Sequence, residues 1–188
     1  DVSLKNGISD LREYANVANC YFIMKDTIST IKHYNSLIEN INNTTINKSN
    51  SDIIATAMGD YVLLGYKNEA TRCFELLCRL NKEELPFNYL VNLAIFYEHV
   101  VSADSAAITR LKLYSTTSRI ESKYDAARWL TRYYAQKGDY EKAAEYAIKF
   151  IDANEAVIDK TNLEHTTNAR NFFQYRRDKE EEALVMQK

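Results

Sequence analysis

The stretch from Lys137 to Ala144 reads KGDYEKAA and joins two segments whose apolar residues follow a helical period. A glycine accepts the left-handed backbone angles at the end of a helix, and an acidic residue directly after it caps the next helix. Gly138 and Asp139 hold these two positions. Ala143 is small enough to let the two helices approach closely. The stretch therefore predicts a tight helical hairpin.

The same turn occurs earlier in the chain. The segment Gly65–Ala70 (GYKNEA) has the glycine-to-alanine spacing of Gly138–Ala143 (GDYEKA), and the two copies lie 73 residues apart, or two periods of about 36. A third pair is expected midway, with Ser102 and Ala107 in the places of the glycine and the alanine. Repetition at this interval predicts stacked hairpins, in which each pair covers the open apolar face of its neighbour.

Apolar periodicity extends this pattern over the whole chain. Helix pairs are expected at residues 8–41, 52–81, 87–118 and 124–154, within a repeat domain at residues 1–161, and a terminal helix at residues 162–188. Asp26 and Asp52 are expected to cap helices, and Pro86 suits a first helical turn. The polar segment Asn42–Ser51 predicts a loop, and its Asn-x-Thr and Asn-x-Ser triplets are weak signals for glycosylation.

Bulk composition excludes several classes of protein. Only 4 glycines and 1 proline occur, too few for the many turns of an all-β fold. The net charge of −2 implies no broad attraction to nucleic acid or to an anionic membrane. No apolar run approaches the roughly 20 residues that cross a bilayer. The composition is that of a globular, helical protein.

The chemistry-bearing residues do not form a recognisable active site. The three cysteines are too few for a disulfide scaffold and are expected to be buried structural thiols: Cys20, Cys73 and Cys78. The three histidines are expected to be ordinary surface or half-buried side chains: His33, His99 and His165. The sequence contains neither a phosphate-binding loop nor a dinucleotide fingerprint. It therefore predicts no enzyme, no cofactor and no metal site.

Two units of the pattern resemble the tetratricopeptide repeat family. The better unit carries Leu130, Tyr134, Gly138, Asp139, Tyr140 and Ala143, and the second carries Tyr61, Gly65, Ala70 and Phe74. Thr131 stands where the family has a small residue, and Ala147 where it has an aromatic one. The match covers about two thirds of the chain. The resemblance implies an all-α fold: a right-handed superhelical stack of antiparallel hairpins with a long C-terminal helix.

The segment Phe172–Leu184 adds a second resemblance, to the long helix that ends the repeat region of Bacteroidetes membrane-associated signalling and transcriptional regulators. This resemblance implies a membrane anchor and an output domain beyond Lys188, with the repeats on the extracytoplasmic (periplasmic) side; a cytoplasmic location is the alternative. A second interpretation rests on the residues alone. Phe172 and Phe173 cap the exposed end of the stack, and the seven charged residues Arg176–Glu182 make a solvated helix.

Family resemblance also implies where a ligand binds, because the first helices of successive hairpins line a concave groove. The groove positions transferred to the second pair are Asp52, Ala55, Gly59 and Val62. Those of the third and fourth pairs are Tyr89, Asn92, Phe96, His99, Asp125, Arg128, Arg132 and Gln136. Arg128 and Arg132 share one helical face, and with Asn92 they make a donor cluster for a carboxylate. The alternative is that both arginines solvate their helix or pair with Asp125. Trp129 is expected to pack rather than to anchor a ligand.

The function expected from these patterns is that of a non-catalytic protein-interaction or sensory module. It binds a peptide or partner protein in the groove, as part of a larger signalling protein, and does not itself contact nucleic acid. A structural scaffold that forms a homodimer through its convex face or its tail is the alternative. A third interpretation is a transcriptional regulator whose DNA-binding part lies outside this sequence.

Overall fold

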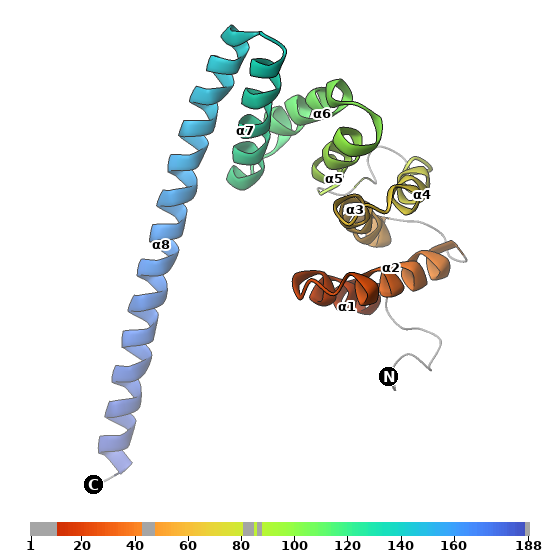
Figure 1. Cartoon of the computed structure of the whole chain (residues 1–188). Coiled ribbons are helices and arrows are strands. Elements are labelled where there is room, and N and C mark those ends of the chain that lie inside the picture. Colours follow the sequence, from red (N-terminus) through yellow and green to blue (C-terminus); the bar gives the residue numbers. More distant parts are fainter. Residues whose placement is uncertain (1–10, 43–47, 81–84, 86–87, 187–188) are drawn as a thin grey trace. The chain divides into compact units, whose positions relative to one another are not determined.

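The computed structural model describes residues 11–42, 48–80, 85 and 88–186 of the chain, and every regular element in these ranges is helical. The elements, shown in Figure 1, are α1 (Leu11–Ile23), α2 (Thr27–Asn42), α3 (Lys48–Leu63), α4 (Lys67–Leu77), α5 (Tyr89–Phe96), the π-helical segment η3 (Tyr97–Val101), α6 (Ala103–Thr116), α7 (Ile120–Gln136) and α8 (Tyr140–Met186). The fold is all-α, as expected. Contacts divide it into two units, Asp1–Ser115 and Thr116–Lys188.

Helix α3 is the centre of the first unit. It packs against α1, α2, α4 and α5. Its middle is buried around most of its circumference, since Ile54, Ala55, Ala57 and Met58 are all fully covered. Large side chains from the neighbouring helices, such as Tyr34 and Leu37 of α2 and Leu77 of α4, complete this core. Burial of this apolar area is the main favourable term that holds the unit together.

The two predicted glycine turns have the same geometry. Gly65 and Gly138 have φ angles of 87° and 76°. In each turn the glycine N–H donates to the carbonyl three residues back, and the next N–H donates to the carbonyl five residues back. This pair of hydrogen bonds is the Schellman motif, which satisfies carbonyls that a helix end leaves free. Ala70 and Ala143 are both buried, and each lies five residues after the glycine of its turn. The predicted repeat of the turn is therefore confirmed.

A third copy of this turn lies at Lys25, where the sequence shows no glycine. Lys25 has a φ of 61°, and its N–H donates to the carbonyl of Phe22. The next N–H, of Asp26, donates to the carbonyl of Tyr21, five residues back. The turn between α1 and α2 thus repeats the hydrogen bonds of the glycine turns with a side chain in the left-handed region, which is unfavourable for an L-residue.

Side chains cap α2, α6 and α8. Asp26 accepts hydrogen bonds from the backbone and hydroxyl of Ser29, and Asp139 accepts one from the backbone of Lys142, both as predicted. Ser102 caps α6 in the same way, through the backbone N–H of Ser105. The cap predicted at Asp52 is wrong, because α3 begins four residues earlier, at Lys48. The expected loop Asn42–Ser51 is accordingly shorter; residues 43–47, Pro86 and Ile8 lie outside the described residues.

The π-helical segment η3 explains the irregular third pair. A π-turn takes up an extra residue relative to an α-turn, and the N–H of Ser102 donates to the carbonyl of Tyr97, five residues back. This is the bond that Asp139 makes in the fourth pair, so Ser102 holds the place of Asp139 and not of the glycine. Ala106, whose N–H bonds the carbonyl of Ser102, then replaces Ala107 as the equivalent of Ala143. The predicted register is wrong by one residue.

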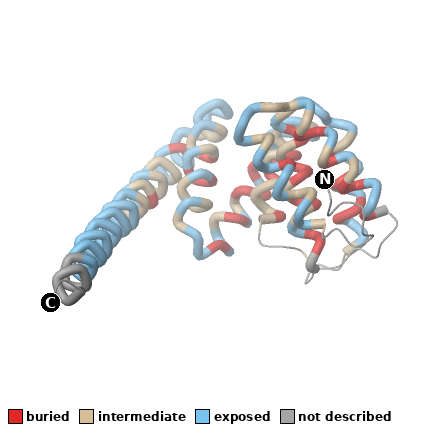
Figure 2. Tube along the Cα trace, turned by 90° about the horizontal axis from the view of Figure 1, so that it is seen from below, coloured by how far each residue is buried: buried red, intermediate tan, exposed pale blue. Residues whose placement is uncertain are grey.

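The second unit is the antiparallel hairpin of α7 and α8. Tyr124 packs on Phe150, with ring centroids 5.0 Å apart, and Tyr134 stacks on Tyr146 at 5.7 Å. The separate terminal helix expected at residues 162–188 is not observed, because α8 runs without a break from Tyr140 to Met186. Neither glycine nor proline occurs in this stretch to end it. In Figure 2 the part of α8 from residue 161 to residue 179 is exposed on all sides.

Candidate functional site

One face of α7 carries the predicted groove residues of the fourth pair. All four are exposed: Asp125, Arg128, Arg132 and Gln136. They are separated by three or four residues, which places them on one side of the helix. Among the described residues, neither arginine has a carboxylate within ion-pair distance. The alternative in which the arginines pair with Asp125 is therefore not what the structure shows. Two guanidinium groups are presented to solvent.

Aromatic residues border this face. The ring of Trp129 stacks on Tyr133 one turn later, with centroids 5.2 Å apart and planes 13° from parallel. The ammonium group of Lys137 lies 5.7 Å from the centroid of Tyr133. Trp129 is half-buried, in keeping with a packing role. The α7 face therefore combines two free guanidinium groups with an ordered aromatic edge, a combination suited to planar anionic groups.

The predicted groove residues of the third pair lie differently. Tyr89 and Phe96 are buried in the core of the first unit, where Phe96 stacks on Phe74 at 4.9 Å. They do not line an open surface, and this part of the prediction is corrected. Asn92 is half-buried and donates a hydrogen bond to the carbonyl of Asn88. Only His99, on η3, is exposed.

The groove positions predicted on α3 are also mostly interior. Ala55, Gly59 and Val62 are buried, and only Asp52 is exposed. Gly59 faces α5: a Cβ there would lie 2.1 Å from Oδ1 of Asn92. Gly59 lets α3 and α5 approach closely, so its role is packing. At Gly59 the sequence pattern marked a contact position of α3 but assigned it to a ligand instead of to α5.

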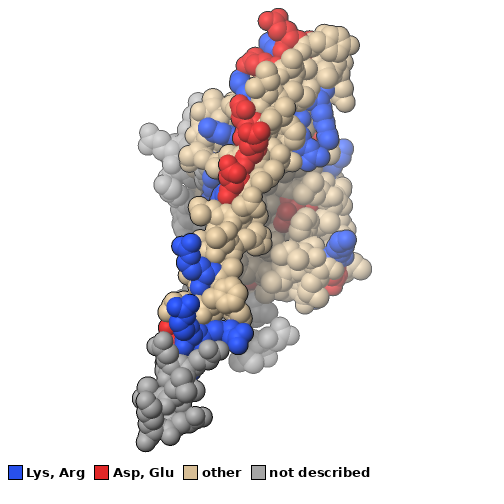
Figure 3. Space-filling model, turned by 90° about the vertical axis from the view of Figure 1, so that its left-hand side faces the viewer, with Lys and Arg blue, Asp and Glu red and all other residues tan. Residues whose placement is uncertain are grey.

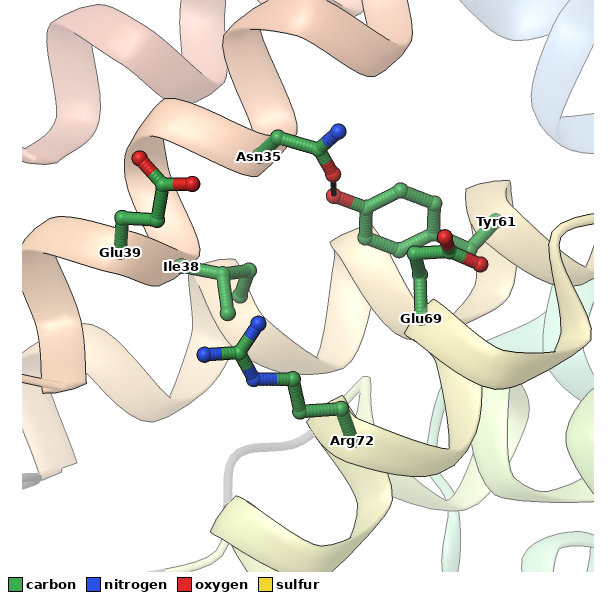
Figure 4. A pocket seen from close by; sticks show the side chains of 6 residues that line it. All are labelled: Asn35, Ile38, Glu39, Tyr61, Glu69 and Arg72. Atoms are coloured by element: carbon green, nitrogen blue, oxygen red, sulfur yellow. Dashed lines mark hydrogen bonds between the residues drawn. The ribbon is translucent and has the colours of Figure 1, made fainter.

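A small pocket that the sequence did not reveal lies between α2, α3 and α4. It has a volume of about 160 Å³ and is lined by Asn35, Ile38, Glu39, Tyr61, Glu69 and Arg72. In Figure 4 Asn35 and Arg72 lie on opposite sides of the space, with Glu39 and Glu69 on the other two. The hydroxyl of Tyr61 donates a 2.8 Å hydrogen bond to Oδ1 of Asn35. Only contacts between different helices create this pocket, so no local sequence signal predicts it.

Tyr34 and Asp60 form a hydrogen-bonded polar pair in the first unit. The hydroxyl of Tyr34, which is fully buried, donates a 2.5 Å hydrogen bond to Oδ2 of Asp60. Burial raises the pKa of Asp60, and the hydrogen bond from Tyr34 opposes that shift. Burial also raises the pKa of Tyr34, and the nearby carboxylate of Asp60 adds to the shift. The pair joins α2 to α3.

The cysteines and histidines do not gather into a site. Cys73 is buried as predicted, and burial raises the pKa of its thiol to about 12. Cys20 and Cys78 are exposed, contrary to the prediction of buried thiols. His33 stacks on Tyr21 at 5.4 Å. In the part of the chain that the structure describes, no three acidic, cysteine or histidine side chains are placed to hold a metal ion.

No protein-family model, curated protein or solved structure matches this chain. Within the described ranges, no helix has the length and apolar character needed to cross a membrane. The exposed face of α7 is thus the candidate site that both the sequence pattern and the geometry of the chain single out.

Proposed function

We propose that this chain is a non-catalytic interaction module that binds an acidic segment or a free carboxyl terminus of a partner protein on the exposed face of α7. The observation that carries the proposal is the pair of exposed guanidinium groups of Arg128 and Arg132, which have no carboxylate partner among the described residues. Arginine donates two parallel hydrogen bonds to a carboxylate in a fixed geometry. Two arginines one turn apart can therefore bind successive carboxylates of an extended segment of the partner protein.

A tetratricopeptide-like solenoid is the arrangement we propose for the repeats. Its support is the packing of α1 on α3 and of α3 on α5, which are the first helices of successive pairs. The recurring turn at Lys25, Gly65 and Gly138 is further support, since each hairpin reverses through the same hydrogen bonds. In such a solenoid α7 is the first helix of the fourth pair, and the exposed arginines belong to the binding face.

We further propose that the chain is one region of a larger signalling or transcription-regulatory protein, and that α8 connects the repeats to the rest of it. Helix α8 continues past its contacts with α7, among which is the ion pair of Lys160 with Glu121 at 2.5 Å. From residue 161 to residue 179 every side chain is exposed. A helix that extends so far beyond its hairpin is suited to transmitting or anchoring the result of binding.

Binding to a short acidic probe tests this proposal. The probe is a fluorescein-labelled hexaglutamate peptide with a free carboxyl terminus, titrated with the full chain and followed by fluorescence anisotropy. The R128A/R132A variant is expected to bind at least about tenfold more weakly, because it loses charge-assisted hydrogen bonds. A hexaglutamine peptide with an amidated terminus should bind neither protein.

The matched control is K32A/K67A, which removes two exposed positive charges from α2 and α4 and leaves α7 intact. It should bind the probe like the wild type. Equal weakening by both double variants would reduce the effect to net charge and overturn the proposal. Absence of any binding to the wild type would favour the alternative, a scaffold without a groove ligand.

A further inference from the structure

Apolar side chains follow one face of α8 that α7 does not cover. They are exposed although most of them are large: Ile148, Ile151, Ile158, Ala169, Phe172 and Phe173. We call this set the α8 seam. Its intervals of 3, 7, 11 and 3 residues between Ile148 and Phe172 are close to whole helical turns, so the residues form a stripe. The side chains that pack on α7, such as Tyr146 and Phe150, lie on a different face.

Charges beside the seam are segregated along the helix. Asp152 and Asp159 lie in its first half, and Arg170 and Arg177 in its second. The intervals of 7, 11 and 7 residues keep all four on the same flank of the stripe. Figure 3 shows the result: a row of acidic side chains along the long helix gives way to basic ones farther down. All four residues are exposed.

These four groups have no partner among the residues that the structure describes. None of them belongs to an ion pair or a side-chain hydrogen bond, whereas Lys149, Lys160 and Asp178 nearby are bonded within the unit. Two carboxylates and two guanidinium groups thus flank an apolar stripe. Their mutual distance along one straight helix prevents the aspartates from meeting the arginines within one copy.

We propose that the α8 seam is a self-association surface, on which a second copy of α8 packs antiparallel. With a two-fold axis between Glu164 and His165, Asp152 faces Arg177 of the second copy. The same axis sets Asp159 against Arg170, because both pairs are centred on the same point of the helix. Symmetry doubles these to four ion pairs, and Ile158 of each copy packs near Phe172 of the other. The interface is isologous, as in most protein dimers.

The charge pattern favours a second copy over an unrelated helix, and an antiparallel arrangement over a parallel one. The seven-residue spacing of the two aspartates equals that of the two arginines, which is what self-complementarity requires. In a parallel pair in register, residues on the same flank of the two helices lie on opposite sides of the interface, so the aspartates and arginines of one copy would not face those of the other. The surface lies apart from Arg128 and Arg132, so self-association does not depend on the function proposed above.

Charge reversal tests the arrangement in the full chain. The mass of the protein in solution, measured by light scattering after size exclusion and by sedimentation, should be that of a dimer. The variants R170E/R177E and D152K/D159K are each expected to be monomeric at the concentration at which the wild type is dimeric. An equimolar mixture of the two should form a dimer again, since every reversed group then faces an opposite charge.

The control is K32E/K67E, which changes the net charge as much as R170E/R177E but acts on α2 and α4. It should remain dimeric. Circular dichroism at 222 nm shows whether each variant keeps its helices. A monomeric wild type, dimeric charge-reversed variants, or a mixture that stays monomeric would each overturn the proposal. Weaker probe binding by R128A/R132A with an unchanged mass would show that the two surfaces act separately.

Discussion

The side chain of Asn92 fills the space into which a side chain at Gly59 would project. A Cβ on Gly59 would lie 2.1 Å from Oδ1 and 3.0 Å from Cγ of Asn92, well inside contact distance. The amide of Asn92 is held by its hydrogen bond to the carbonyl of Asn88, and Asn88 in turn donates to Oγ1 of Thr56 on α3. The close approach of α3 and α5 therefore depends on a glycine in one helix and a tethered amide in the other.

We predict that Gly59→Ala lowers the free energy of unfolding by about 1–3 kcal/mol, as overpacking does in other cores. The measurement is urea unfolding followed by circular dichroism. Asn92→Ala removes the clashing atoms, so the double variant G59A/N92A should be less destabilised than the sum of the two single changes. Strict additivity would contradict the contact.

A second prediction concerns the left-handed residue at Lys25. Lys25→Gly is expected to stabilise the first unit by up to about 1 kcal/mol, because glycine adopts a positive φ without the steric cost that a side chain carries. Gly65→Ala and Gly138→Ala should destabilise by about 1 kcal/mol each, and only through the backbone, since nothing lies within 4 Å of a Cβ at either position. Thermal unfolding of the three variants checks the opposite signs.

Asp60 gives a pH-dependent prediction. Its pKa is raised by burial, so the folded state disfavours the carboxylate, and stability is expected to fall as the pH rises through the folded pKa. Asp60→Asn removes this penalty. The variant should be more stable than the wild type at pH 7, and the difference should vanish below the ordinary value of 3.8. Urea unfolding over a pH series measures the difference.

Tyr34→Phe provides the companion test. The hydrogen bond from Tyr34 lowers the pKa of Asp60, against the effect of burial. Its removal should therefore raise that pKa further, which carbon-detected NMR of the Asp60 carboxyl records directly. A value for Asp60 below 3.8 in the wild type would show that the hydrogen bond outweighs burial and would reverse the predicted pH dependence.

Asp139 is expected to show the opposite behaviour. The side chain and the backbone N–H of Lys142 both donate to its carboxylate and lower its pKa. The contribution of Asp139 to the free energy of unfolding is then present above pH 3.8, and it is lost as the pH falls through the folded pKa. Lys142→Ala should move the pKa of Asp139 upward but leave it below 3.8, because the backbone donor remains. An unchanged pKa would contradict the bond to the ammonium group.

Features encoded by neighbouring residues were predictable from the sequence. Gly138 and Asp139 end one helix and cap the next through bonds within five residues, and Gly65 repeats the first of these steps. Lys25 adopts the same turn, but no glycine in the sequence predicts it. The packed hairpin of α1 and α2 imposes the conformation. The exposed arginines were also predictable, from their spacing on a strongly patterned helix.

Features set by contacts between helices were not predictable. The pattern of α5 identifies Tyr89 and Phe96 as one apolar face, but only the packed structure shows that this face meets the core. The polar residues Lys48 to Asn50 favour a loop locally, yet α3 extends through them. The continuity of α8 was predictable, because neither glycine nor proline occurs after Gly138. This absence is a better guide to the end of the helix than the change in composition near Asn162.

The length of α8 has a mechanical consequence. The part of α8 beyond Lys160, which forms an ion pair with Glu121 of α7, is about 39 Å long at 1.5 Å per residue. Such a helix works as a lever arm. A tilt of about 5° at the hairpin, small enough to arise from repacking of a few side chains, moves its far end by about 3 Å. Motion at the hairpin therefore reaches the C-terminal end of the helix enlarged.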